Sequence, residues 1–274
     1  MSFDAHDVTT SMNEHNAAVR RQFALQASTF TDTGFAAKGL DWIVDEVNPS
    51  STDLMVDVAA GAAHLGRAFA SRVAHVSALD LTPEMLEQGR ALAQAAGLGN
   101  IAYLRGDAIS LPWISDQFDL AACRLTLHQV ADPALVVGEM VRVTRPGGRV
   151  AVIDLTAPDS PQTAAEMNRI ERLRDPSHGR TLTLNETRSL LTDVGAEVVL
   201  VSQHDQPVDV EDWMARTATP TAVRETIRRR FDDELGGGPA TGLRPARDGE
   251  GVLTLTHIWT LTIAVVGESS AESG

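Results

Sequence analysis

The feature that most constrains how this chain folds is a regular alternation of short apolar runs and helical patterns between residues 53 and 155. Five of the runs have the length and the apolar character of buried strands, and they cover residues 54–58, 75–79, 101–104, 118–123 and 149–155. Parallel strands need a crossover connection between them, and a helix usually supplies it. The alternation therefore predicts an α/β fold built on a parallel sheet.

Two of the helical patterns begin with a residue suited to cap a helix, followed by proline. Thr82-Pro83 and Asp132-Pro133 place a side-chain acceptor beside a residue that loses no hydrogen bond at the first helical position. We expect Thr82 and Asp132 to cap the two helices. The segment Arg-Pro-Gly-Gly at 145–148 should end the second helix, because proline cannot continue it.

The alternation is looser outside this stretch. Two more runs with strand character, 197–203 and 252–265, bring the expected number of strands to seven. Further helical patterns cover about 11–28, 35–47, 160–174, 185–194 and 209–235.

Two helical segments are expected to cover a binding site. We expect residues 1–52 to form an N-terminal helical lid on a second unit that comprises residues 53–274. Within that unit an insertion at about 204–251 separates the last two strands, and insertions of this length beside an α/β sheet often cover a pocket. Its glycine-rich end, 236–251, is expected to be a mobile loop that buries little surface.

Charge and composition exclude several classes of partner. The chain carries 23 Lys and Arg against 37 Asp and Glu, so its formal net charge is -14, which repels nucleic acid and anionic lipid.

One cysteine, Cys123, cannot form an internal disulfide, and the histidines lack metal-ligand spacing, so we expect no metal site. The first fifteen residues show neither a basic start nor an apolar stretch. We expect a cytoplasmic protein without a membrane span; its oligomeric state stays open, with a homodimer as one alternative.

Acidic residues follow three successive strands, where a parallel sheet places its ligands. Asp57 leads into a turn of small residues, Asp80 ends the second strand, and Asp107 follows the third. An acid at the second strand end is placed to accept hydrogen bonds from ribose hydroxyls, and Asp107 could accept from an adenine amine. The apolar segment 111–113, Leu-Pro-Trp, could cover the ring. The order of these residues predicts a nucleoside site, whereas the lack of G-x-G-x-x-G disfavours NAD and FAD.

These motifs resemble those of class I S-adenosylmethionine (SAM)-dependent methyltransferases, in particular the UbiE-like small-molecule group. The resemblance is carried by VDVAAGAAHLG (56–66), LDLTPEMLEQGR (79–90) and the run from LRGDAISLPW (104–113) to RVAVIDL (149–155). It implies a Rossmann-like, seven-stranded, mostly parallel sheet with an antiparallel last strand, helices on both faces and a helical lid. It also implies SAM as the cofactor and S-adenosylhomocysteine as its product.

Carried over position by position, the resemblance implies ten cofactor-binding residues: Phe30, Asp57, Ala59, Gly61, Asp80, Leu81, Asp107, Ala108, Arg124 and Leu125. Asp57 would anchor the amides of the turn and the amino group of the cofactor. Asp80 would hold the ribose and Asp107 the adenine. Arg124 and Leu125 would border the methionine part and the methyl group.

The first motif departs from the family pattern D-x-G-x-G-x-G. Alanine occupies the first and third glycine positions, Ala59 and Ala63, and His64 follows. The departure implies a slightly different cofactor position or weaker binding. It also keeps an alternative open, in which the SAM-binding fold has lost methylation and the protein is a cyclase-like or other non-methylating biosynthetic enzyme.

The main hypothesis is methyl transfer to oxygen, carbon or nitrogen of a small-molecule metabolite. Such a displacement chiefly needs alignment and exclusion of water, and an oxygen acceptor also benefits from a base. His128, four residues after Arg124, is the candidate base, with packing against the sheet as its alternative role. His178 is a second candidate, but the preceding Asp-Pro-Ser at 175–177 favours a capped turn.

Overall fold

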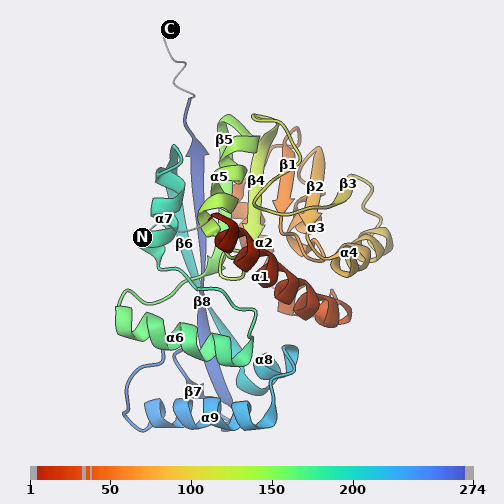
Figure 1. Ribbon diagram of the computed structural model, residues 1–274. Coiled ribbons are helices and arrows are strands. Elements are labelled where there is room, and N and C mark those ends of the chain that lie inside the picture. Colours follow the sequence, from red (N-terminus) through yellow and green to blue (C-terminus); the bar gives the residue numbers. More distant parts are fainter. Residues whose placement is uncertain (1–4, 33–34, 38, 269–274) are drawn as a thin grey trace.

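The computed structural model of the protein describes residues 5–32, 35–37 and 39–268, and its centre is one mixed sheet (Figure 1). The strands are β1 (Leu54–Val58), β2 (His75–Asp80), β3 (Ile101–Arg105), β4 (Phe118–Arg124), β5 (Thr144–Leu155), β6 (Ala196–Asp209), β7 (Ala246–Arg247) and β8 (Leu253–Val266). They follow the order β3-β2-β1-β4-β5-β8-β6, and β7 pairs with β8. The first five are parallel, and β8 runs antiparallel to β5 and β6. The predicted α/β fold with an antiparallel last strand is confirmed.

Helices cover this sheet and extend beyond it. They are α1 (Ala5–Gln26), α2 (Asp41–Val47), α3 (His64–Phe69), α4 (Pro83–Ala95), α5 (Pro133–Val143), α6 (Pro161–Arg174), α7 (Leu184–Thr192), α8 (Val210–Arg216) and α9 (Thr221–Leu235), with 3-10 turns η1 (Ala27–Thr29) and η2 (Phe35–Ala37). The helical pattern predicted over 35–47 is thus divided into η2 and α2.

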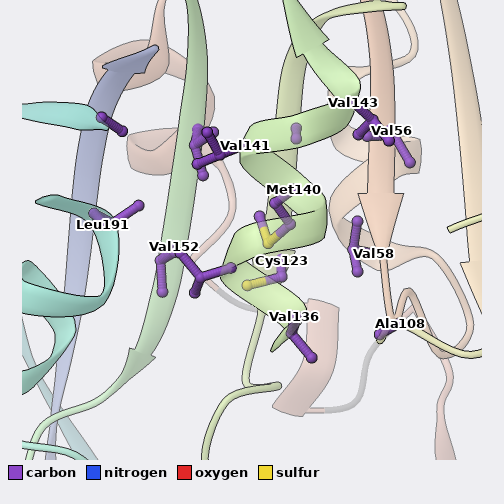
Figure 2. Packing of buried hydrophobic residues seen from close by; sticks show 14 of the residues in the cluster. Val56, Val58, Ala108, Cys123, Val136, Met140, Val141, Val143, Val152 and Leu191 are labelled. Atoms are coloured by element: carbon purple, nitrogen blue, oxygen red, sulfur yellow. The ribbon is translucent and has the colours of Figure 1, made fainter. Parts of the chain in front are cut away.

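The two faces of the sheet bury alternate residues of the same strands, as a strand period of two requires. Val56 and Val58 pack with Met140 of α5 in one apolar cluster, part of which Figure 2 shows. Met55, which precedes Val56 in the sequence, packs with Phe69 of α3 in the cluster on the other face. Both faces of the parallel strands are therefore covered by helices, which explains why these strands are almost wholly apolar.

The two predicted helix caps have different outcomes. Asp132 caps α5, because its carboxylate accepts the N–H groups of Ala134 at 3.0 Å and Leu135 at 3.2 Å. The prediction that the Thr82 side chain caps α4 is wrong, since that side chain makes no cap hydrogen bond. The Thr82 N–H instead donates to Asp80 at 2.8 Å, so the neighbouring carboxylate, and not the Thr82 hydroxyl, accepts a hydrogen bond at the start of α4. α5 ends at Val143, just before the Arg-Pro-Gly-Gly segment.

β8 extends past the parallel strands to the region of α6, α8 and α9 (Figure 1). A third apolar cluster lies there, built from these helices and from β8. It contains Trp213 of α8 and Phe231 of α9, which are at most 1% exposed. β6 reaches this region because it continues in register with β8 to Asp209, six residues beyond its predicted end. The glycine-rich segment is more ordered than expected: Leu243 is fully buried in this cluster, and β7 pairs with β8.

Among the residues that the structure describes, none of the helices has both the length and the apolar character needed to cross a membrane.

Candidate active site

A cavity of about 850 Å³ lies at the carboxyl ends of β1, β2, β3 and β4, and residues of α1 also line it. Ligands of open α/β sheets bind at this edge. The ten cofactor-binding residues that the resemblance implies and the first candidate base all line the cavity: Phe30, Asp57, Ala59, Gly61, Asp80, Leu81, Asp107, Ala108, Arg124, Leu125 and His128. All of them except Phe30 lie at or just after the ends of β1 to β4, which are neighbours in the sheet, so Asp57 and His128, 71 positions apart, meet at one edge.

The turn after β1 keeps a glycine-like backbone despite its two alanines. Ala59, Gly61 and Ala63 have φ angles of 53°, 54° and 52°, in the left-handed region that favours glycine. This conformation costs an alanine roughly 1–2 kcal/mol. The departure from the family motif therefore leaves the path of the turn intact and adds backbone strain beside the cavity.

Asp57 is 1% exposed, and its carboxylate accepts the N–H of Gly66 at 2.8 Å. A Cβ atom on Gly66 would lie 2.9 Å from Oδ2, so this approach requires glycine. The hydrogen bond comes from α3, whereas we expected the amides of the turn itself. Burial raises the pKa of Asp57 to about 7, against the opposing effects of the Gly66 hydrogen bond and the charge of Arg124.

Asp80 joins the turn after β1 to the start of α4. Its Oδ2 accepts the N–H of Gly61 at 2.7 Å, and its Oδ1 accepts that of Thr82 at 2.8 Å. Leu81 and the Thr82 side chain also donate to this carboxylate, which lines the cavity. Burial raises the pKa of Asp80. Leu81 follows on the cavity wall.

Asp107 is held between the sheet and the N-terminal helix. Its Oδ1 accepts the N–H of Ile109 at 3.2 Å, and its Oδ2 accepts from Asn16 of α1 at 2.8 Å. The adjacent Ala108 is 7% exposed and lines the cavity. Asn16 is a cavity residue that the sequence did not reveal, because the contact spans 91 positions.

The expectation that Leu111, Pro112 and Trp113 cover an adenine ring is wrong, because none of the three lines the cavity. Glu139 and Arg142 of α5 hold this loop away from it. The Leu111 N–H donates to Glu139 at 2.6 Å, and Arg142 donates to the carbonyl of Trp113 at 2.9 Å. Leu111 and Trp113 thereby pack on the main core.

Arg124 and Leu125 form the cavity wall at the end of β4. Arg124 donates through Nη2 to the carbonyl of Ala36 at 2.6 Å, and its guanidinium carbon lies 5.2 Å from the ring centroid of Trp259. Within the described part of the chain, its Nη1 is buried and has no hydrogen-bond partner. Burial lowers the pKa of Arg124 to about 10, although Asp57 opposes the shift. Leu125 has a φ of 54°, another non-glycine residue in the left-handed region.

Phe30 and His64 complete the cavity wall beside the turn after β1. Phe30, from the segment after α1, is 8% exposed, and its ring centroid lies 6.3 Å from that of His64. Burial, followed by the charges of Arg67 and Arg124, lowers the pKa of His64 to about 4. His64 is therefore neutral at physiological pH and adds no positive charge to the cavity.

The two candidate bases lie in different places. His128 is 8% exposed, lines the cavity and contacts Asp154 through Nδ1. His178 does not line it and forms a hydrogen bond of 2.9 Å with Asn168. Asp175 accepts from the N–H of Ser177 at 2.9 Å, so the capped turn predicted before His178 is confirmed.

A further part of the cavity wall escaped the sequence reasoning. It comes from the end of α6, from β6, from α8 and from β8, and includes Arg174, Gln206, Asp209, Asp212, Trp213, Arg216, His257 and Trp259. The sequence predicted only that an insertion at about 204–251 would cover a pocket; no local motif marks these residues, which reach the cavity through the packing of α6, α8, β6 and β8. Asp154 is different: a lone acid at the end of an apolar strand is a visible signal, and it could have been paired with His128. In the described ranges, no group of three or more His, Cys, Asp or Glu side chains could hold a metal ion.

Comparison with known proteins identifies relatives of this chain. The model of the methyltransferase domain family matches residues 56–152. The uncharacterized methyltransferase YcgJ of Bacillus subtilis is 30% identical over 207 residues, 75% of this chain and 82% of YcgJ. The ubiquinone/menaquinone biosynthesis C-methyltransferase UbiE of Roseobacter denitrificans is 32% identical over 125 residues, 44% of this chain and 48% of UbiE.

Solved structures agree with these matches. The crystal structure of YcgJ has a TM-score of 0.76 at 26% identity and covers 84% of this chain and 98% of YcgJ. A putative methyltransferase from Bacillus halodurans has a TM-score of 0.77 at 25% identity, with 84% and 99% covered. At 14–15% identity the likeness shows the fold alone. A geranyl diphosphate methyltransferase in complex with SAM (TM-score 0.57, 84% of each chain covered) and the [4+2]-cyclase SpnF (0.58, 84% and 80%) are both in this range.

Proposed function

Because this chain belongs to the methyltransferase domain family, in its UbiE-like class I SAM-dependent group, we propose that it transfers a methyl group from SAM to oxygen, carbon or nitrogen of a small-molecule metabolite. Its cofactor is SAM. One observation carries the proposal: the acids after β1, β2 and β3 line a single cavity together with the glycine-like turn. This arrangement suits a nucleoside that is linked to an amino acid.

The residues present fit the chemistry of SAM. Asp80 lines the cavity at the end of β2 and would accept from the ribose hydroxyls, and Asp107 with Ala108 would bind the adenine. The buried carboxylate of Asp57 would hold the cationic amino group, while the unpartnered Nη1 of Arg124 would bind the carboxylate. When bound, SAM supplies an activated methyl group on a sulfonium.

We assign the remaining cofactor contacts to the cavity wall around these groups. Ala59 and Gly61 would border the methionine part through their backbone, and Leu81 would flank the ribose. Phe30 would cover the cofactor from the segment after α1. Leu125 would lie beside the transferred methyl group, and His128 would be the base for an acceptor that must lose a proton.

The helical elements around the cavity would exclude water. We propose that residues 1–52 act as a lid and that the helices between β6 and β8 act as a cap on the acceptor side. Positions on α1 and α8 line the cavity together with the strand ends, which supports this division. The formal charge of -14 supports a small-molecule acceptor over a nucleic acid. The single, buried Cys123 fits the cytoplasm as the place of action.

The altered first motif was the reason to consider a non-methylating enzyme. Ala59 and Ala63 keep the backbone conformation of glycine, so the turn gives no support to that alternative. The likeness to SpnF, at 15% identity, concerns the fold and not the reaction.

Calorimetry with SAM and with NADH tests the cofactor site. SAM should bind and NADH should not, and Asp80→Ala should weaken SAM binding at least about tenfold, the effect of losing about 1.4 kcal/mol. Asp45→Ala removes an exposed acid of α2, whose side chain is 72% accessible, and should leave the affinity unchanged. Unchanged SAM affinity in Asp80→Ala would refute the ribose assignment. Incubation with methyl-labelled SAM and a metabolite extract should yield a labelled small molecule.

A further inference from the structure

The carboxylate of Asp154, at the end of β5, gathers an unusual number of donors. Its Oδ2 accepts the N–H groups of Thr126, Leu127 and His128 at 3.1, 2.6 and 3.2 Å. Its Oδ1 accepts the N–H of Leu155 at 2.7 Å and contacts Nδ1 of His128. Asp154 is 6% exposed. One side chain therefore holds both the loop after β4 and the imidazole ring that this loop presents to the cavity.

The two oxygens of Asp154 have separate tasks. The three consecutive loop amides all donate to Oδ2, so the hydrogen bonds that hold the loop after β4 do not depend on the contact between Oδ1 and the His128 ring. An ionised carboxylate only accepts hydrogen bonds, so Nδ1 of His128 must carry the proton that faces Oδ1. The other nitrogen, Nε2, is then left with a lone pair. In the described part of the chain, no hydrogen bond engages Nε2, and the ring lines the cavity.

The charged groups around His128 come from three elements. Asp154 lies on β5, Glu171 and Arg174 lie on α6, and His178 follows α6, with its ring centroid 5.7 Å from that of His128. Burial lowers the pKa of His128, but the charge and the hydrogen bond of Asp154 outweigh it, so the net shift is upward. Burial lowers the pKa of His178 to about 4, so that ring is neutral near pH 7. An imidazolium formed at His128 is thus stabilised by Asp154.

We propose that Asp154 is a positioning residue that fixes His128 with Nε2 toward the cavity, where it accepts the proton of an acceptor hydroxyl group, a phenol or an enol. This inference rests on the proposed function and names its acceptor class. The hydroxyl proton moves to Nε2 and the oxygen's electron pair forms the bond to the methyl carbon. The carbon–sulfur electron pair stays on sulfur, and His128 then releases its proton to water.

Nitrogen-15 NMR of the histidine rings in the full chain tests the Asp154–His128 dyad without any acceptor. The wild-type protein should show His128 protonated at Nδ1, with a pKa above 6.5. In Asp154→Asn the amide NH₂ group would donate to Nδ1, so the proton should move to Nε2 and the pKa should fall. Asp53→Asn is the matched control, because it changes a buried carboxylate that binds Arg149 at 2.7 Å and does not line the cavity.

A wild-type His128 protonated at Nε2 would overturn the proposal, as would a His128 pKa that is the same in Asp154→Asn and Asp53→Asn. The wild-type spectrum decides the tautomer by itself, so the proposal stays testable even if Asp154→Asn does not fold. Calorimetry with SAM on the same samples tests the proposed function separately from the dyad. Absence of SAM binding by the wild type would refute the proposed function, whereas the spectra report on the dyad alone.

Labelled methyl transfer with a metabolite extract tests the acceptor class. The label should be found in a methyl ether, and Asp154→Asn should lower kcat by about 10²–10⁴-fold with little change in the KM for SAM. The rising limb of the kcat pH profile should shift with the pKa of His128 measured by NMR. A label on sulfur or on an amine nitrogen would overturn the hydroxyl assignment.

Discussion

Several residues at the cavity are held in states that cost free energy. Ala59, Ala63 and Leu125 have left-handed backbone conformations, and Asp57 is a carboxyl group without exposure. Strain and buried charge of this kind persist where the surrounding fold over-determines them, and they cluster at functional sites. Here all four residues lie within or beside the turns that end β1 and β4. All four shape the end of the cavity to which we assign the cofactor.

The raised pKa of Asp57 predicts a pH-dependent affinity for SAM. Between the ordinary value near 4 and the folded value of about 7, the unfolded chain ionises this carboxyl and the folded one keeps it protonated. The stability that the protonated form contributes is therefore lost as the pH rises through this window. A cationic amino group favours the ionised form, so SAM affinity should rise about tenfold from pH 6 to 7.5 and binding should release protons.

Calorimetry in two buffers of different ionisation enthalpy measures this proton release. Asp57→Asn should weaken binding and abolish most of the pH dependence. If the wild-type affinity is the same at pH 6 and 7.5, the role assigned to Asp57 is wrong.

At the scale of elements, the molecule has separate apolar cores for the sheet and for the helices that we propose as a cap. The two clusters on the sheet support the strand ends that carry the acids, whereas the cluster between α6, α8 and α9 supports the cap. The sheet and the cap share β8, which is long enough to take part in both. From this division we predict that the side of the cavity proposed for the acceptor can open without disturbing the side proposed for the cofactor.

Phe231→Ala should therefore loosen the cap selectively. Phe231 is fully buried in the cap cluster, and removing its ring should cost about 3–5 kcal/mol locally. Hydrogen exchange should accelerate in α6, α8 and α9, while β1 and β2 stay protected and SAM affinity changes little. Phe69→Ala, at an equally buried site beneath β1, is the control and should destabilise the sheet itself. Equal acceleration in the cap and the sheet of Phe231→Ala would show one cooperative unit instead.

At the scale of the whole molecule, the excess of acid is the main long-range feature. Arginines form surface ion pairs, such as Arg228 with Glu211 at 2.6 Å and Arg244 with Asp205 at 2.7 Å. Exposed pairs of this kind contribute little each, and they leave a net charge of -14 that repels itself.

Salt should therefore stabilise the protein. Raising NaCl from 0.01 to 0.15 M shortens the screening length from about 30 to about 8 Å, which weakens repulsion between distant acids more than contact ion pairs. We expect the thermal midpoint to rise by a few degrees, measured by scanning calorimetry. KCl at the same ionic strength should give the same rise if the cause is screening. A fall of the midpoint with salt would mean that the ion pairs outweigh the net repulsion.

The sequence by itself determined the parallel half of the sheet and the acids at its edge. Apolar period, proline and capping residues act over a few positions, so 54–58 and 118–123 could be assigned as strands and Asp57 and Asp80 placed at strand ends without knowledge of the partners. Parallel strands put their carboxyl ends at one edge, which brought these acids together in the prediction as well. Local reasoning failed where a competing contact existed, as for Thr82 and the neighbouring carboxylate of Asp80.

Only the tertiary structure decided what faces the acids. Trp213 and His257 reach the cavity through packing of the cap, more than 150 positions from Asp57, and no residue near them in sequence signals that position. The same holds for the contact of Asn16 with Asp107, which depends on which faces of the helices and strands are buried. Local patterns report the conformation of each segment. The contacts between segments depend on how their apolar faces pack, and the part of the cavity wall that faces the acids is made of such contacts.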